Sequence, residues 1–157
     1  MPPTTALELE LVGRLAAAAL LTGALGWERE RARKAAGLRT HMLVGIAAAL
    51  FTVLSEAIAL RPGGAPTDLL RTIQAVATGV GFLGAGVFFA APSEARARGL
   101  TTAASLWAAS AVGMCAGAGY YVLGFGATLL LLVVLNTLHR APFETSRQSP
   151  PSGSDAP

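Results

Sequence analysis

Charged residues are scarce in this sequence, and their scarcity argues against a soluble globular domain. Only 13% of the 157 residues are charged, whereas a soluble domain usually carries about 25%. The net charge of +3 does not indicate a nucleic-acid binder, because the arginines separate apolar runs and form no stripe with interleaved aromatics. Long apolar runs alternating with short charged segments instead indicate a multi-pass membrane protein.

Cysteine and catalytic signatures are also scarce. The single Cys115 excludes an intramolecular disulfide and lies in an apolar run, where we interpret it as a small packed residue. No Ser-His-Asp set, glycine-rich phosphate loop or metal-ligand cluster is recognisable in the sequence. We therefore expect no enzymatic activity and no resident cofactor.

Five apolar segments are long enough to cross a bilayer as helices. Crossing the hydrocarbon core takes about 20 helical residues, and backbone groups in lipid must hydrogen-bond internally. The sequence therefore predicts an all-α membrane protein, a bundle of about five transmembrane helices in one domain over residues 11–140. If the turn at 117–120 were only a bend in one helix, four spans would remain. The predicted spans are 11–27, 42–60, 73–91, 100–116 and 121–138.

The distribution of lysine and arginine predicts the orientation of this bundle. With the N-terminus outside, nine basic residues fall on the cytoplasmic side, and only Arg61 and Arg71 fall outside. Residues 1–10 then form a short extracytoplasmic N-terminus, which lacks the positive region of a secretory signal. Residues 141–157 are rich in proline, serine and glycine and predict a disordered cytoplasmic tail.

Small residues in the third and fourth predicted spans indicate close helix packing. Helices in lipid have little hydrophobic drive to associate, so their interfaces are rich in small residues. The glycines within 79–86 predict stripes where another backbone approaches. Alternatively, they allow a helix to bend or a cation to reach backbone carbonyls. The fourth span carries a similar series: Ala104, Ser105, Ala108, Ala109, Gly113 and Gly117.

Two ionisable residues lie inside predicted spans and are functional candidates for that reason. Arg14 and Glu56 each fall a few residues inside the outer end of a span, roughly 5 to 6 Å deep at a rise of about 1.5 Å per residue. We hypothesise an intramembrane ion pair between them. The alternative is that each side chain extends separately to the interface.

Two motifs near the predicted cytoplasmic helix ends are more specific than composition. The first is GWERE at 26–30 followed by AGLRTHMLVG at 36–45. The second is VGFLGAGV at 80–87 followed by RGLTTAASLW at 98–107. Together these motifs closely resemble the transmembrane domain of the MgtC/SapB family, and the resemblance extends over most of the chain.

The resemblance implies a multi-pass protein of the bacterial inner (plasma) membrane, linked with growth under magnesium limitation and, in pathogens, with survival in the host. Family members look more like regulators or interaction partners than like magnesium transporters. An effect on the F-type ATP synthase is associated with part of the family. Two features depart from it: this chain has no room for the soluble C-terminal domain of many members, and Arg96 stands where the family usually has Asn.

Polar residues at the expected cytoplasmic helix ends predict caps and anchors. We expect Thr40 to cap the N-terminus of the second span, and Thr101 or Thr102 that of the fourth. His41 and His139 have no second metal ligand at helical spacing. We interpret them as interface anchors, with a pH-sensing role as the alternative.

Glu28 is the acidic residue best placed to meet the arginines at these ends. We predict that it pairs with Arg39 or Arg98 in a partly buried cluster, the alternative being ordinary anchoring by the arginines. Glu28 and Glu30 offer the carboxylates that Mg²⁺ needs, but five nearby basic residues oppose a cation. The functional motif candidates are Glu28, Arg29, Arg39, Thr40, Gly81, Gly84, Arg98, Gly99, Thr101, Thr102 and Trp107.

Three functions are compatible with the sequence. The first is a regulatory or interaction protein of the MgtC/SapB type, acting as an oligomer or against a larger membrane complex. The second is a small cation transporter or channel, for Mg²⁺ first, which needs a polar path across the bilayer. The third is a small multidrug-efflux subunit, which the sequence disfavours because those proteins have a glutamate in the first of four spans, where this chain has Arg14. Polar candidates for a path are Thr52, Ser55, Glu56, Gln74, Thr78, Ser105 and Asn136.

Overall fold

Five helices build the protein over the residues that the structure describes. The computed structural model describes residues 5–60, 67–90 and 96–137, without the side chains of residues 67–68 and 96–98. The predicted C-terminal tail and His139 lie outside the described residues. The helices are α1 (Thr5–Arg31), α2 (Leu38–Ala59), α3 (Thr67–Ala90), α4 (Arg96–Gly117) and α5 (Tyr121–Thr137).

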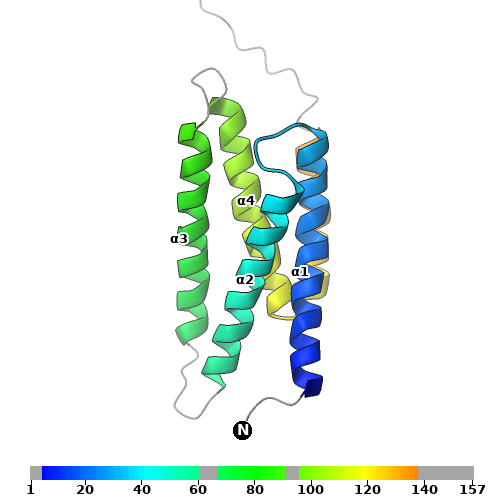
Figure 1. Cartoon of the computed structure of the whole chain (residues 1–157), viewed down its shortest axis with the longest axis vertical. Helices are drawn as coiled ribbons and strands as arrows, with labels where there is room; N and C mark the ends of the chain where they lie inside the picture. The colour runs from blue at the N-terminus through cyan, green and yellow to red at the C-terminus, as the bar shows by residue number, and fades with distance from the viewer. Residues whose placement is uncertain (1–4, 61–66, 91–95, 138–157) are drawn as a thin grey trace, which may run out of the picture.

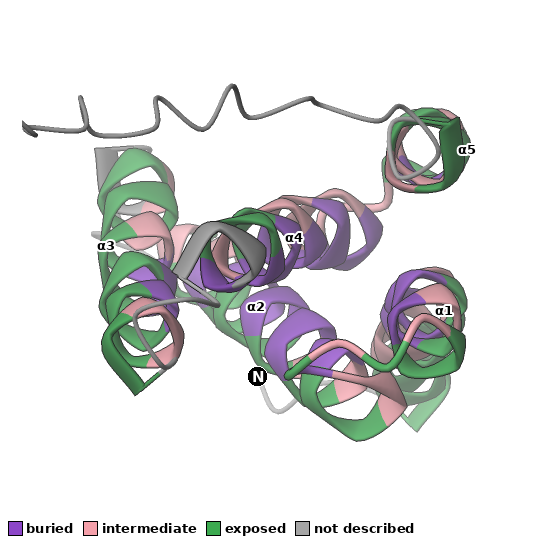
Figure 2. Ribbon diagram, turned by 90° about the horizontal axis from the view of Figure 1, so that it is seen from above, coloured by how far each residue is buried: buried purple, intermediate pink, exposed green. Residues whose placement is uncertain are grey.

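Successive helices run in opposite directions along the bundle (Figure 1). Viewed along the bundle, α4 lies at the centre, between α3 on one side and α5 on the other, and α1 and α2 lie along its flank (Figure 2). Because the number of passes is odd, the beginning of α1 and the end of α5 lie at opposite ends of the molecule.

The helix lengths suit a membrane. α1 to α4 are each long and apolar enough to cross one, and α5 is a shorter apolar helix of 17 residues. At a rise of about 1.5 Å per residue, α5 extends roughly 26 Å, slightly less than a hydrocarbon core of about 30 Å. The predicted all-α bundle of about five membrane helices is confirmed. α1 begins before the predicted span because residues 5–10 are mostly strong helix formers.

A glycine turn separates α4 from α5, so the two are distinct helices. The Tyr120 N–H donates to the Cys115 carbonyl at 2.8 Å, and the Gly119 N–H donates to the Ala116 carbonyl at 3.0 Å. These two bonds make up a Schellman motif, which needs a residue in the left-handed region after the helix. Gly119 supplies it with a φ of +80°. The chain therefore turns sharply here instead of continuing as one bent helix.

Glycines bring α2 and α4 into backbone contact at the centre of the bundle. A methyl group added at Gly113 would overlap the carbonyl oxygen of Gly45 and lie 2.8 Å from its Cα. One turn further along, a methyl at Gly117 would lie 2.6 Å from the carbonyl oxygen of Ala49. Small residues permit this approach, so the close packing predicted for the fourth span is present at both of its glycines.

The glycines of α3 do not pack as predicted. A methyl added at Gly79, Gly81 or Gly86 would meet nothing within 4 Å, whereas one at Gly84 would lie 3.2 Å from the Cβ of Ala103. The interpretation of these glycines as stripes that receive a neighbouring backbone is wrong within this chain, except at Gly84. α3 lies at the edge of the bundle (Figure 2), so most of its surface faces outwards.

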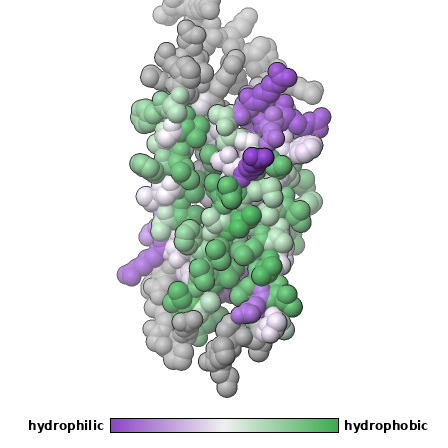
Figure 3. Space-filling view, viewed as in Figure 1, coloured by the Kyte–Doolittle hydropathy of each residue, from purple (hydrophilic) through white to green (hydrophobic). Residues whose placement is uncertain are grey.

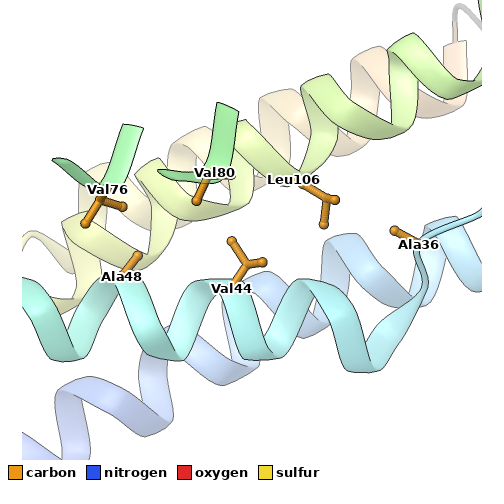
Figure 4. Packing of buried hydrophobic residues seen from close by; sticks show 6 residues of the cluster. All are labelled: Ala36, Val44, Ala48, Val76, Val80 and Leu106. Atoms are coloured by element: carbon orange, nitrogen blue, oxygen red, sulfur yellow. The ribbon is translucent and has the colours of Figure 1, made fainter. Parts of the chain in front are cut away.

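The core is small and the outer surface is apolar. Large hydrophobic side chains such as Phe82, 81% exposed, and Val122, 88% exposed, cover the outside. On the face shown in Figure 3, hydrophobic side chains fill the middle, and hydrophilic ones gather where α1 ends and α2 begins. Such a surface requires lipid around it. The buried cluster in Figure 4 consists of Ala36, Val44, Ala48, Val76, Val80 and Leu106.

Candidate functional site

The first polar cluster surrounds Arg14, near the end where α1 begins. Arg14 Nη1 lies 2.9 Å from Glu56 Oε2 of α2, and Arg14 Nη2 lies 2.9 Å from Glu10 Oε1 one turn earlier. The Arg14 side chain is 16% exposed and that of Glu56 is 40% exposed. The structure therefore brings together the two intramembrane ionisable residues, and does not leave each extending separately to the interface.

Arg14 also reaches α4. Its Nη1 donates to the carbonyl oxygen of Gly117 at 3.1 Å, one of the last carbonyls of α4, which has no partner within its own helix. A cation at a helix C-terminus is favourable because the carbonyl dipoles point towards it. One guanidinium thus ties α1 to α2 through Glu56 and to α4 through Gly117. This arrangement can fix the relative positions of three helices.

The second cluster lies at the opposite end and contains a buried arginine. Arg29 is 1% exposed, and its Nε pairs with the carboxylate of the adjacent Glu28. Of the two predicted partners, Arg39 is exposed and forms no ion pair with a described carboxylate, so Glu28 does not pair with it. The side chain of Arg98, the other predicted partner, lies outside the described residues.

The periodicity of α1 explains why Arg29 faces inwards. Ala18, Thr22 and Leu25 are at most 1% exposed, and Arg29 continues their series at helical spacing on one face. The predicted span ended at residue 27, whereas the helix continues to Arg31 and carries Arg29 into the bundle. The Nη2 atom of Arg29 has no hydrogen-bond partner among the described residues. Glu28 therefore compensates a buried charge, and its loss would leave that charge unpaired.

His41 is buried between α2 and α4 and is not the interface anchor that the sequence predicted. It is fully buried, with Nδ1 2.9 Å from the Gly37 carbonyl oxygen and Nε2 3.1 Å from Ser105 Oγ. A carbonyl only accepts, so His41 Nδ1 carries a proton and donates to Gly37. The Ser105 hydroxyl also lies 2.8 Å from the Thr102 carbonyl oxygen. No local pattern identifies such a pair, because its partners are 64 residues apart.

A carboxylate from α1, not Thr40, accepts a hydrogen bond at the N-terminus of α2. The helix begins at Leu38 after Gly37, which makes no side-chain cap. Glu30 Oε2 accepts a hydrogen bond from the Leu38 N–H at 2.8 Å, and negative charge is favourable at this position. Thr40 is exposed, so the predicted cap is wrong. Sequence reasoning missed Glu30 because an interaction across a loop between two helices has no fixed spacing.

The motif residues of α4 lie within the helix. α4 begins at Arg96, so Thr101 and Thr102 fall in its second turn, and the predicted cap by either threonine is wrong. Gly99 and Thr102 are buried, whereas Thr101 and Trp107 are exposed. With the outward Gly81 described above, the motif divides between the core of the bundle and its surface. It does not converge on one site.

Glu28 and Glu30 do not converge on a cation. One oxygen of Glu28 contacts Arg29, and one oxygen of Glu30 accepts from the Leu38 N–H. Within residues 5–60, 67–90 and 96–137, no group of three or more His, Cys, Asp or Glu side chains could hold a metal ion. The geometry adds no support for a magnesium site beyond that of the sequence.

Comparison with known proteins finds a matching family model and relatives that are similar over most of this chain. The model of the MgtC family matches residues 15–142. The "Putative magnesium transporter YhiD" of Escherichia coli (strain K12) is 41% identical over 137 residues, which are 85% of this chain and 63% of the relative. "Protein MgtC" of Brucella abortus (strain 2308) is 41% identical over 120 residues, 76% of this chain and 48% of the relative.

A cyanobacterial relative matches over more of its own length. "Protein SrpB" of Synechococcus elongatus is 39% identical over 139 residues, 84% of this chain and 76% of the relative. The chain spans less than two thirds of the first two relatives. No solved structure matches the chain significantly.

Proposed function

Because the chain belongs to the MgtC family, we propose that it is a regulatory or interaction protein of the bacterial inner membrane. In this proposal it supports growth when magnesium is scarce and, in a pathogen, survival in the host. It acts by contact with other membrane proteins and has no catalytic role. Its partner is a second copy or a larger complex, and the F-type ATP synthase, to which the family resemblance points, is the first candidate.

The observation that carries this proposal is a set of outward glycines on α3, with Gly79 and Gly86 on one face and Gly81 on the opposite face. Gly79, Gly81 and Gly86 have open space where a side chain would be. A surface that only met lipid would gain helix stability from larger residues, whereas small residues let another helix approach closely. An apolar groove of about 630 Å³ between α2 and α3 is lined by Gly79 among others, on the face of α3 that carries Gly79 and Gly86.

The α1–α2–α4 interface supports interaction over transport. Its helices touch through glycine backbones at Gly45 and Gly113, which leaves no polar path at that level of the interface. The Thr52 and Thr128 hydroxyls donate to carbonyls of their own helices at 2.9 and 2.8 Å. Groups satisfied in this way do not need a passing ion or water as a partner.

Growth complementation tests the proposal directly. Gly81→Leu and Gly86→Leu should insert and fold, because a Cβ added at either position would meet no other part of the chain within 4 Å, but they should fail to restore growth at low magnesium. Gly126→Leu is the matched control, since it places the same side chain into open space on α5 and should restore growth. Restored growth with both α3 variants would contradict the proposal.

Magnesium transport is the alternative, and the name of the Escherichia coli relative favours it. Purified protein in vesicles that contain a fluorescent magnesium reporter separates the two functions. No flux, together with a co-purifying membrane protein, supports interaction. Flux that Glu28→Ala or Glu56→Ala abolishes would make transport the better function.

For the orientation, we propose that the end carrying the α1–α2 connection faces the cytoplasm. Arginine and lysine are retained on the cytoplasmic side of membrane proteins. Arg29, Arg31, Arg33, Lys34 and Arg39 all belong to this connection or to the helix ends beside it.

A further inference from the structure

A pocket with both charged and apolar walls lies between α1 and α5. Its volume is about 700 Å³, and the two helices stand next to each other at one edge of the bundle (Figure 2). The pocket is at the end where α1 and α5 finish. This is also the end that carries the basic residues of the α1–α2 connection. The residues that define its chemistry are Ala24, Trp27, Glu28, Arg31, Leu132 and Asn136.

The polar wall presents charges of opposite sign side by side. Glu28 and Arg31 are three residues apart on α1 and therefore share a face. Arg29 bonds one carboxylate oxygen of Glu28, and a carboxylate can accept further hydrogen bonds. Arg31 is exposed and has no ion pair among the described carboxylates. The amide nitrogen of Asn136 donates to the Leu132 carbonyl at 2.9 Å, which leaves its oxygen as an acceptor.

The apolar wall lies on the bilayer side of these charges. Ala24 is one turn before Glu28 on α1, and Leu132 is one turn before Asn136 on α5, so both lie nearer the middle of the bundle. Trp27 is 58% exposed, and tryptophan is enriched at the level of lipid headgroups. The pocket thus changes from polar to apolar in the direction in which a lipid changes from headgroup to acyl chain.

We propose that this pocket binds a zwitterionic phospholipid whose headgroup carries a primary ammonium. Arg31 binds the phosphate, because a guanidinium donates in parallel to two phosphate oxygens. Glu28 and the Asn136 oxygen accept hydrogen bonds from the ammonium, and an acyl chain lies along Ala24 and Leu132.

The same geometry disfavours the other common lipids. An anionic phosphatidylglycerol headgroup offers no ammonium to the Glu28 oxygen that Arg29 leaves free. A phosphatidylcholine headgroup is zwitterionic, but its quaternary ammonium has no N–H to donate to Glu28 or Asn136. A free molecule with the same headgroup gains nothing from the apolar wall. This inference does not depend on whether the chain regulates or transports.

Native mass spectrometry of the purified full chain in detergent tests the proposal. We expect phosphatidylethanolamine to be retained roughly fivefold more than phosphatidylglycerol or phosphatidylcholine, about the effect of one charge near a lipid surface. Arg31→Gln should lower the retention of all three lipids, because it removes the contact with the phosphate that they share. Arg39→Gln is the matched control, since Arg39 is exposed, lies near the same end and does not line the pocket. This variant should retain each lipid as the unchanged protein does.

Two further measurements keep the test independent of folding. Glu28→Gln should abolish the discrimination against phosphatidylcholine. That variant also unpairs the buried Arg29 and risks misfolding. Asn136→Leu therefore serves as a second variant, which should lose part of the discrimination against phosphatidylcholine. Equal or stronger retention of phosphatidylglycerol would overturn the proposal, as would equal effects of Arg31→Gln and Arg39→Gln. Displacement of the lipid by an equimolar amount of glycerophosphoethanolamine would also overturn it, by showing that the apolar wall contributes nothing.

Discussion

Replacing Gly113 by alanine should destabilise the bundle, whereas the same replacement at Gly81 should stabilise it slightly. Both residues are helical glycines within membrane-spanning segments, and both replacements add one methyl group. At Gly113 the methyl would meet the backbone of Gly45, and at Gly81 it would meet nothing within 4 Å. The two variants therefore isolate the effect of helix contact from that of helix propensity.

The magnitude follows from two opposing contributions. Alanine gains up to about 1 kcal/mol over glycine in a helix interior at either position. At Gly113 the added methyl would lie 2.8 Å from the Gly45 Cα and closer still to its carbonyl oxygen, so α2 and α4 must separate by at least about 0.6 Å before ordinary contact begins. Forcing packed elements apart typically costs about 1–3 kcal/mol or more, and here the obstacle is backbone that has no other rotamer. We expect Gly113→Ala to lose about 1–2 kcal/mol and Gly81→Ala to gain about 0.5–1 kcal/mol.

Unfolding of both variants in mixed micelles by titration with a denaturing detergent, followed by circular dichroism, measures this difference. The slope of the transition should stay the same, because the unfolding reaction is unchanged. If Gly113→Ala were as stable as Gly81→Ala, α2 and α4 would not be in backbone contact, and the assignment of the core to these two helices would be wrong.

Three further predictions concern the helix ends and the orientation. A double-mutant cycle of Arg14→Gln and Glu56→Gln should give a coupling free energy of about 0.6 kcal/mol, typical for polar pairs in membrane bundles; a coupling of zero would show that the two residues act separately. Glu30→Gln should lower the free energy of unfolding by about 1 kcal/mol through the lost helix-end charge, while Thr40→Ala should change it by less than about 0.5 kcal/mol; the reverse ranking would restore Thr40 as the cap. A reporter fused after residue 140 should be active only in the cytoplasm, and a periplasmic signal would refute the proposed orientation.

The number and nature of the helices were predictable from the sequence because both depend on local quantities. Apolar length decides whether a segment can cross the bilayer, and backbone groups in lipid leave helix as the available structure. The turn at Gly119 was also predictable, since a short glycine-containing segment between two apolar runs marks a helix end. The pairing of Arg14 with Glu56 was one of two alternatives. Sequence position gives the depth of each residue in the membrane, but not the direction in which its side chain points around the helix axis.

The partners of the polar residues were not predictable in the same way. Glu28 pairs with its neighbour Arg29, and Glu30 serves α2, because α1 continues to Arg31 and turns these side chains by fixed angles of 100° per residue. A shift of one or two residues in a helix boundary changes which face each side chain occupies. The sequence predicted the boundary of α1 several residues too early, and it therefore missed the pairing of Glu28 with Arg29.

Composition and periodicity by themselves determined that this chain lies in lipid as about five antiparallel helices, because hydropathy sums over neighbours in the sequence. Only the tertiary structure decided which glycines are contacts and which are surface. Gly81 and Gly113 are identical in chemistry and similar in local sequence, and they differ only in what lies opposite to them, which is open space for one and the backbone of α2 for the other.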